Sequence, residues 1–225
     1  MSIPNLQEVI TMPNIPVLYS SRNCPFCLRA RVALLYAKQK VILRNVEFTN
    51  LPAEALAVSS HATVPSLVFS DDEYWDESWD IVKWATQQRD QDNWLGQDGE
   101  YLNDTEMLVE INDHSFTEDL RHYKNPDNDA EHPQQYYRDR GEEFLEELND
   151  MLEENDFLLA SHMTIADIAV FPFVRAFAMV DKEWFDTTPY PKLHSWLSGL
   201  LDTDWYREAM KEHEIWVPGS EDVYL

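Results

Sequence analysis

The chain has 225 residues, of which 44% are hydrophobic, so it has enough apolar material for one large domain or two modest ones and does not have the composition of a disordered protein. Asp and Glu outnumber Lys and Arg 42 to 17, and the formal net charge of -25 argues against partners with phosphate backbones and against anionic membranes. The plain interpretation of this acidity is a solvated shell, with an acidic docking face for a basic partner as the alternative.

The N-terminus, MSIPNLQEVI, lacks the basic and apolar regions of a signal peptide, and no run of about twenty apolar residues is present to span a bilayer. We therefore expect a cytoplasmic protein. Cys24 and Cys27 are the only cysteines, and in a reducing compartment such a closely spaced pair is more often redox-active or metal-binding than structural.

Strand and helix patterns alternate over the first ninety residues. A short apolar strand over 17–19 leads through a polar loop into a helix over 25–39, which Pro25 can begin because a first-turn residue needs no N–H partner. The expected elements that follow are a strand over 41–48, a helix over 52–58, strands over 63–69 and 73–75, and a helix over 77–89. This βαβ plus ββα order, with the two cysteines at the first strand-to-helix junction, predicts an α/β thioredoxin-like domain over 15–89.

The remainder of the chain is helical in pattern. Residues 90–103 are polar without a sustained period, which predicts a linker, and residues 104–225 are expected to form an all-α domain. Its predicted helices cover 104–121, 134–153, 165–180, 193–201 and 204–213. The helix over 165–180 is almost wholly apolar and is expected at the centre of the domain, whereas the tail from Pro218 is expected to be loose.

The cysteine motif Cys24-Pro25-Phe26-Cys27 predicts thiol chemistry. A cysteine at a helix N-terminus is stabilised as the thiolate by unpaired N–H groups and the helix dipole, so Cys24 is the expected attacking thiol and Cys27 the resolving or modulating one. Three nearby arginines could lower the pKa of Cys24 further, although they could also be ordinary helix-surface residues; they are Arg22, Arg29 and Arg31.

Two other interpretations of the cysteine pair are weaker. Zinc needs four ligands, and the sequence has neither a second cysteine pair nor a closely spaced histidine pair, so we expect no metal. The pair could also be two ordinary buried cysteines, but its position at the strand-to-helix junction argues against coincidence.

Pro65 begins a strand that is expected to face the cysteines. A cis bond before it would leave the backbone of Val64 as an open hydrogen-bonding edge for an extended, peptide-like ligand, while a trans proline would simply start an edge strand. Glu77 and Ser78 stand at the next helix start. An exposed Ser78, with the acidic Glu77 before it, could receive the charged amino-acid end of that ligand, or the two residues could only cap the helix.

Taken together, Cys24-Pro25-Phe26-Cys27, Thr63-Val64-Pro65 and Glu77-Ser78, followed by a helical half, resemble the glutathione S-transferase superfamily. The likeness covers essentially the whole chain and is closest to the cysteine-containing, two-domain glutaredoxin-2-like members. The matching segments are CPFCLRAR, VPSL, ESWDIV and DIAVFPFVR.

The resemblance implies a bound glutathione along the Val64-Pro65 edge, with its sulfur beside Cys24. Its γ-glutamyl end would lie at Glu77 and Ser78, and the implied contacts also include Phe26 and Thr63. Thr164-Ile165-Ala166-Asp167 matches the N-capping box of the superfamily, a folding element. One departure is Leu51, where related proteins usually carry a lysine that contacts a glutathione carboxylate.

Three functions follow from these observations. The leading hypothesis is a glutathione-dependent thiol-disulfide oxidoreductase that acts on a small-molecule or protein disulfide through Cys24. The second is a glutathione transferase or lyase acting on a small electrophile, with Phe116 and Tyr123 as candidate pocket residues that could equally be core. The third is an interaction protein without turnover. The sequence is compatible with a monomer or a homodimer.

Overall fold

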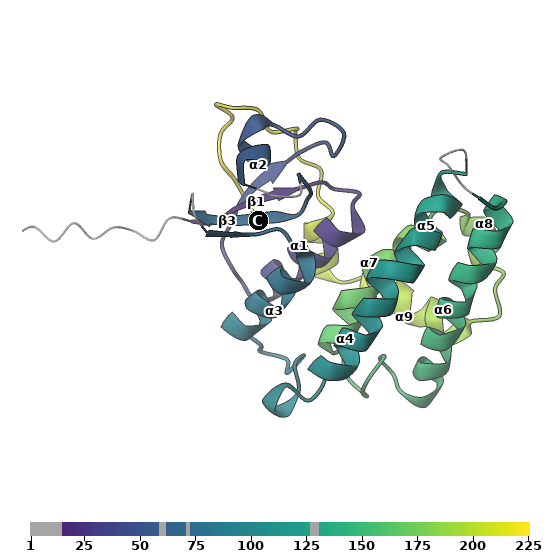
Figure 1. Ribbon diagram of the computed structural model, residues 1–225. Coiled ribbons are helices and arrows are strands. Elements are labelled where there is room, and N and C mark those ends of the chain that lie inside the picture. The colour runs from purple at the N-terminus through teal and green to yellow at the C-terminus, as the bar shows by residue number, and fades with distance from the viewer. Residues whose placement is uncertain (1–14, 59–61, 71–72, 127–130) are drawn as a thin grey trace, which may run out of the picture.

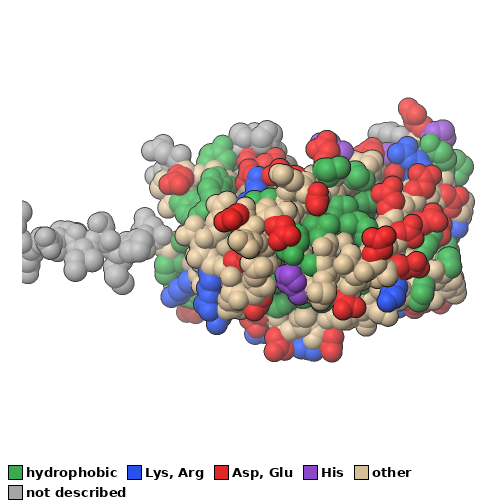
Figure 2. All heavy atoms as spheres, turned by 90° about the horizontal axis from the view of Figure 1, so that it is seen from below, with side chains coloured by type: hydrophobic (Ala, Val, Ile, Leu, Met, Phe, Trp, Pro, Cys, Tyr) green, Lys and Arg blue, Asp and Glu red, His purple; other side chains and the backbone are tan. Residues whose placement is uncertain are grey.

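The computed structural model describes residues 15–58, 62–70, 73–126 and 131–225, so our prediction about the first ten residues lies outside the described part. Within it a mixed α/β domain stands beside a helical domain (Figure 1). This architecture confirms the predicted fold class, an α/β thioredoxin-like domain followed by an all-α domain. Among the described residues, no helix combines the length and the apolar character that a bilayer span requires. Acidic side chains outnumber basic ones on the face of the molecule that Figure 2 shows.

The N-terminal domain follows the predicted βαβ plus ββα order. Its elements are β1 Val17–Ser20, α1 Pro25–Tyr36, β2 Ile42–Asn45, α2 Ala53–Val58, β3 Ser66–Ser70, β4 Glu73–Trp75 and α3 Ser78–Gln88. The structure ends β2 three residues earlier than predicted, because the chain turns there and Glu47 bridges to Asn50.

The described strands form one sheet in the order β4-β3-β1-β2-β5. β1 runs parallel to β2, with Leu18 opposite Leu43, and antiparallel to β3, with Leu18 opposite Leu67. These three leucines share one face of the sheet and belong to the main core with α1 and α3. Because side chains alternate along a strand, Tyr19 faces the opposite side, toward α2.

The C-terminal tail is the largest departure from the sequence prediction. Instead of being loose, it returns to the N-terminal domain, where β5 Val223–Tyr224 pairs antiparallel with β2 (Figure 1). The last residue continues the pairing, since the Leu225 N–H donates to the Val41 carbonyl at 3.1 Å. Although the domain boundaries remain a prediction, this tail packs with the N-terminal sheet rather than with the helices that precede it.

The helical domain contains a 3₁₀ turn, η1 Gln97–Gly99, ahead of its first helix. The helices are α4 Leu102–Ile111, α5 Thr117–Lys124, α6 Gln134–Glu154, α7 Ile165–Ala178, α8 Lys182–Phe185, α9 Pro191–Leu201 and α10 Asp204–Ala209. A π turn, η2 Asn112–Phe116, joins α4 to α5. The single helix predicted over 104–121 therefore extends from Leu102 to Lys124, and its backbone is wider at the π turn.

α7 lies at the centre of the helical domain, as its apolar sequence predicts, and nearly all of its side chains are buried. The predicted capping box at its start is confirmed: both the Thr164 N–H and the Thr164 hydroxyl donate to the Asp167 carboxylate, at 2.7 and 2.9 Å. Phe116 and Tyr123 pack against Phe177 of α7 and are buried, so both belong to the core.

Candidate active site

Cys24 caps the N-terminus of α1. Its backbone is extended, Pro25 follows as the first helical residue, and its carbonyl accepts the first helical hydrogen bond from the Leu28 N–H at 2.9 Å. The half-buried Cys24 sulfur therefore sits where the N–H groups of the first turn point.

Cys27 lies one turn further along and is completely buried. The Ser21 N–H donates to its sulfur at 3.2 Å, and the Cys24 thiol approaches the Val64 carbonyl at 3.9 Å. Both cysteines are free thiols in the structure. The motif and the Val64-Pro65 segment, 40 residues apart in sequence, thus meet at one place.

The two thiols differ in acidity. A hydrogen bond from Cys27 is the main cause that lowers the pKa of Cys24 to about 7, helped by the N–H groups of Cys27 and Phe26 and by the charge of Arg31 and opposed by burial. Burial is the main cause that raises the pKa of Cys27. At neutral pH the more accessible sulfur is therefore also the one with substantial thiolate character.

The three arginines near the motif have different surroundings. Arg31 is buried and donates to the Ser20 hydroxyl at 2.6 Å and to the Arg22 carbonyl at 2.8 Å, so it is a fixed positive charge beneath the cysteines. Arg29 is completely buried and points to the helical domain. The alternative that these arginines are ordinary helix-surface residues is therefore wrong for Arg29 and Arg31. The Arg22 side chain, by contrast, is 40% exposed.

The Val64-Pro65 peptide bond is cis, as the sequence suggested it could be. Pro65 is buried, and the carbonyl of half-buried Thr63 accepts a hydrogen bond from the Ser66 hydroxyl at 2.9 Å. This turn therefore presents the Val64 carbonyl to Cys24.

Glu77 and Ser78 stand at the start of α3, but in different surroundings from those expected. Glu77 is exposed, and no capping hydrogen bond from its side chain is found among the described residues. Ser78 is buried rather than exposed, and its hydroxyl accepts a hydrogen bond from Arg29 at 3.3 Å. Phe26 packs edge-on against Phe173 of α7, with ring centroids 4.8 Å apart.

One part of this site, the C-terminal Trp216, was not predicted from the sequence. It packs with a small apolar group that we call the Tyr19 cluster. The cluster consists of Tyr19, Cys27, Val46, Ala55 and Val64, with Val17, Cys24, Leu51, Val68 and Trp216 partly buried against it. An aromatic residue near a chain end was the available signal, but nothing local indicates which domain it packs against.

Arg44 of β2 connects Trp216 to this cluster. Its guanidinium lies 4.2 Å from the centre of the Trp216 ring and 5.2 Å from that of Tyr19, and it donates a hydrogen bond to the Tyr19 hydroxyl. A guanidinium between two aromatic faces is held by cation–π attraction. Arg44 therefore fixes the C-terminal segment beside the site.

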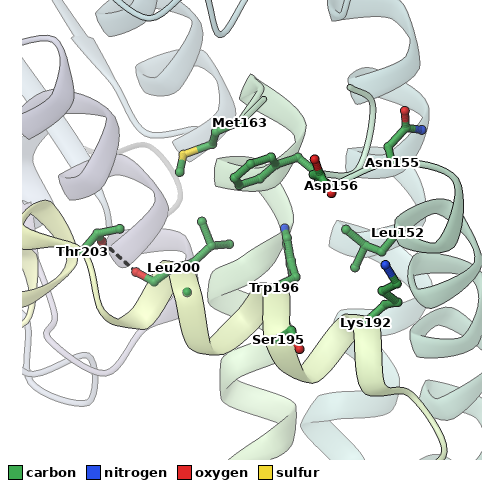
Figure 3. A pocket seen from close by; sticks show the side chains of 11 residues that line it. Leu152, Asn155, Asp156, Met163, Lys192, Ser195, Trp196, Leu200 and Thr203 are labelled. Carbon is green, nitrogen blue, oxygen red and sulfur yellow. Dashed lines mark hydrogen bonds between the residues drawn. The ribbon is translucent and has the colours of Figure 1, made fainter. Parts of the chain in front are cut away.

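Two surface hollows lie away from the cysteines, in the helical domain. One, of about 450 Å³, is lined by residues of α6 and α9 that include Leu152, Lys192 and Trp196 (Figure 3). The other, of about 420 Å³, is lined by residues of α7 to α9 that include Arg175 and His194. Neither includes a predicted site residue. Within the described ranges no group of three or more His, Cys, Asp and Glu side chains could hold a metal ion.

Two family models match this chain. The model of the glutathione S-transferase N-terminal domain matches residues 18–93, and that of the glutathione S-transferase C-terminal domain matches residues 113–198. No curated protein matches the chain significantly.

Solved structures share the fold at low sequence identity. A glutathione transferase family member from Pseudomonas fluorescens, with two glutathione bound, is 18% identical, with 89% of this chain and 94% of that one covered and a TM-score of 0.75. A glutathione transferase from Pseudomonas putida, with one glutathione disulfide bound per subunit, is 19% identical, with coverages of 93% and 94% and a TM-score of 0.75. Glutathione transferase Omega 2C from Trametes versicolor is 18% identical, with coverages of 89% and 94% and a TM-score of 0.67.

Proposed function

This chain belongs to the glutathione S-transferase superfamily, and from that premise we propose that it is a glutathione-dependent thiol-disulfide oxidoreductase with Cys24 as the nucleophile. The observation that carries the proposal is the contrast between the two sulfurs. Cys24 is only half-buried and its pKa is lowered to about 7, whereas Cys27 is completely buried and burial raises its pKa. A thiolate at neutral pH is what attack on a disulfide requires.

In the first step the Cys24 thiolate attacks the glutathione sulfur of a mixed disulfide, RS–SG. The Cys24–SG bond forms, the RS–SG bond breaks, and the leaving thiolate takes a proton from water to give RSH. In the second step the thiolate of another glutathione attacks the glutathione sulfur of Cys24–SG, which forms glutathione disulfide and releases Cys24. The net reaction, RSSG + GSH → RSH + GSSG, is a thiol-disulfide exchange in which the glutathionyl group passes from the substrate to a second glutathione.

Cys27 offers another route for the second step. Its thiolate can attack the Cys24 sulfur, which releases glutathione and leaves a Cys24–Cys27 disulfide that two further glutathione molecules reduce. The raised pKa of Cys27 and its complete burial favour the first route, in which Cys27 only donates a hydrogen bond to Cys24.

We propose that glutathione binds at the cis-proline turn and the start of α3. The Val64 carbonyl lies 3.9 Å from the Cys24 sulfur, so the Val64 backbone would pair with that of glutathione, and the exposed Glu77 carboxylate suits the γ-glutamyl ammonium. A hydroxyl that accepts one hydrogen bond can still donate its own hydrogen, so Ser78 can bind the adjoining carboxylate while it accepts from Arg29. Similar structures from two Pseudomonas species contain glutathione or its disulfide, which supports this choice of ligand.

The test compares wild type, Cys24→Ser and Cys27→Ser in two assays with glutathione, one on a small mixed disulfide and one on a chlorinated aromatic electrophile. We expect disulfide reduction that falls by at least about a hundredfold in Cys24→Ser and by much less in Cys27→Ser. Reduction that survives in Cys24→Ser would contradict the mechanism. Conjugation without disulfide reduction would instead support a transferase.

A further inference from the structure

Four large apolar side chains are exposed around the Tyr19 cluster. Phe48 is 61%, Leu56 49%, Ile215 47% and Val217 58% exposed. Single exposed apolar residues are ordinary on protein surfaces, but several that surround one site indicate an interaction surface.

The contacts of the Tyr19 cluster bring together the chain segments that carry these four residues. Phe48 follows two residues after Val46, Leu56 is next to Ala55, and Ile215 and Val217 flank Trp216, while Val46, Ala55 and Trp216 all belong to the cluster. Figure 1 shows the C-terminal segment passing beside α2 on its way to β5.

Two hydrogen bonds fix the C-terminal segment at the end of β2. The Trp216 N–H donates to the Asn45 carbonyl, and the Asn45 amide donates to the His213 carbonyl, both at 2.8 Å. The exposed apolar side chains therefore lie on a defined surface that borders Cys24, rather than on a detached tail.

The charges on this surface are all of one sign. Residues 45–58 and 212–225 contain six carboxylates and no lysine or arginine. The six, all exposed, are Glu47, Glu54, Glu212, Glu214, Glu221 and Asp222. At the border of this surface Arg22 pairs with Glu212 at 3.7 Å, and Arg44 and Lys40 lie over the rings of Trp216 and Tyr224.

We propose that this acidic apolar surface, formed by the four apolar side chains and the six carboxylates, docks a basic, extended segment of a protein whose disulfide Cys24 reduces. The inference rests on the proposed function and narrows its substrate class to proteins. Lysine or arginine side chains of the partner pair with the carboxylates, and its apolar side chains cover Phe48 and Val217. A second copy of this chain fits poorly, because a two-fold contact would bring the same carboxylates together.

The test uses two glutathionylated peptides of equal length, one with lysine and leucine around its cysteine and one with glutamate and leucine, with a small mixed disulfide as reference. We expect the lysine peptide to be reduced with a kcat/KM at least about tenfold higher than the glutamate peptide at low salt, and this preference to shrink as salt screens the charges.

Two double variants test whether the preference for the lysine peptide depends on the acidic apolar surface. Phe48→Ser/Val217→Ser and Glu47→Gln/Glu54→Gln should each lower kcat/KM for the lysine peptide severalfold and leave the small disulfide unaffected. Matched controls in the helical domain, Met179→Ser, whose side chain is 60% exposed, and Glu146→Gln, should change neither substrate. Circular dichroism confirms that each variant is folded.

The outcomes separate this inference from the proposed function. Equal rates on both peptides, with the small disulfide reduced, would overturn the docking surface and leave the chemistry intact. If the small disulfide is not reduced, binding of the two peptides to Cys24→Ser protein still tests docking, and equal affinities would overturn it. A variant that changes the sedimentation of the protein but not its peptide preference would identify the surface as a self-contact and overturn the proposal as well.

Discussion

Arg29 of α1 and Asp113 of the π turn form a two-pronged ion pair across the interface between the domains, with Nη1 2.8 Å from one carboxylate oxygen and Nη2 2.5 Å from the other. The same guanidinium donates to the Ala169 carbonyl of α7 at 2.8 Å and lies 4.5 Å from the centre of the Phe173 ring. Since Arg29 is completely buried, its charge depends on Asp113 for compensation. The helix that carries Cys24 is thereby fixed to the helical domain.

Removal of Asp113 should be costly. We expect Asp113→Ala to lower the free energy of unfolding by about 3 kcal/mol, because it leaves the buried guanidinium without a counter-charge. Urea unfolding measures this. The control is Asp186→Ala, which breaks the exposed pair with Lys182 and should cost less than about 1 kcal/mol. Equal losses in the two variants would show that the buried ion pair contributes no more to the free energy of unfolding than the exposed one.

The acidity of Cys24 should depend on Cys27. Thiolate is the form that reacts, so the rate of alkylation of Cys24 should rise with pH around a midpoint of about 7 and level off above it. Cys27→Ala removes the main hydrogen bond to the thiolate, which should move the midpoint up, toward 9.0. The measurement is the pH profile of the iodoacetamide rate, with Cys24→Ser as the blank. An unchanged midpoint in Cys27→Ala would exclude that hydrogen bond as the cause.

Two helical glycines offer a matched pair. A Cβ at Gly141 of α6 would lie 2.3 Å from the buried Phe177 ring, so Gly141→Ala should destabilise the protein by about 1–3 kcal/mol through overpacking. A Cβ at Gly199 of α9 meets no described atom within 4 Å, so Gly199→Ala should stabilise it by up to about 1 kcal/mol, since alanine is the better helix former. Opposite shifts in thermal unfolding are the expected result, and shifts of the same sign would contradict it.

Trp216 should hold the C-terminal segment in place. Trp216→Ala removes the ring that contacts Arg44 and Tyr19, and we expect a loss of about 2 kcal/mol, below the range for a fully buried ring. The neighbouring control Val217→Ala changes an exposed side chain and should stay within about 0.5 kcal/mol. Denaturant titration compares the two. Losses of similar size would mean that Trp216 does not anchor the segment.

The order of the N-terminal elements could be predicted because each was specified locally. Pro25 and the apolar spacing after it mark α1. In the helical domain, Thr164 and Asp167 mark the start of α7 in the same local way. The helix over 104–121 was predicted without its π turn. A π turn leaves the helical sequence pattern unchanged and alters only the direction in which residues such as Asp113 point around the helix axis.

The candidate site was predictable in part for the same reason. The position of Cys24 at a helix start follows from sequence, and so does the possibility of a cis bond before Pro65. The burial of Ser78 does not follow from the sequence, because its hydroxyl contacts Arg29, which is 49 residues away along the chain. The assignment of the glutathione contacts remains a prediction.

Local patterns were enough to predict the thioredoxin-like start, the helical second half and the position of Cys24 at a helix start, because periodicity, proline and capping residues act over a few neighbours. The folded structure was needed to find that Arg29 pairs with Asp113 across the domains and that Trp216 and β5 return to the first domain. Contacts between residues far apart in the chain depend on which surfaces meet when the core closes, and no local pattern records that.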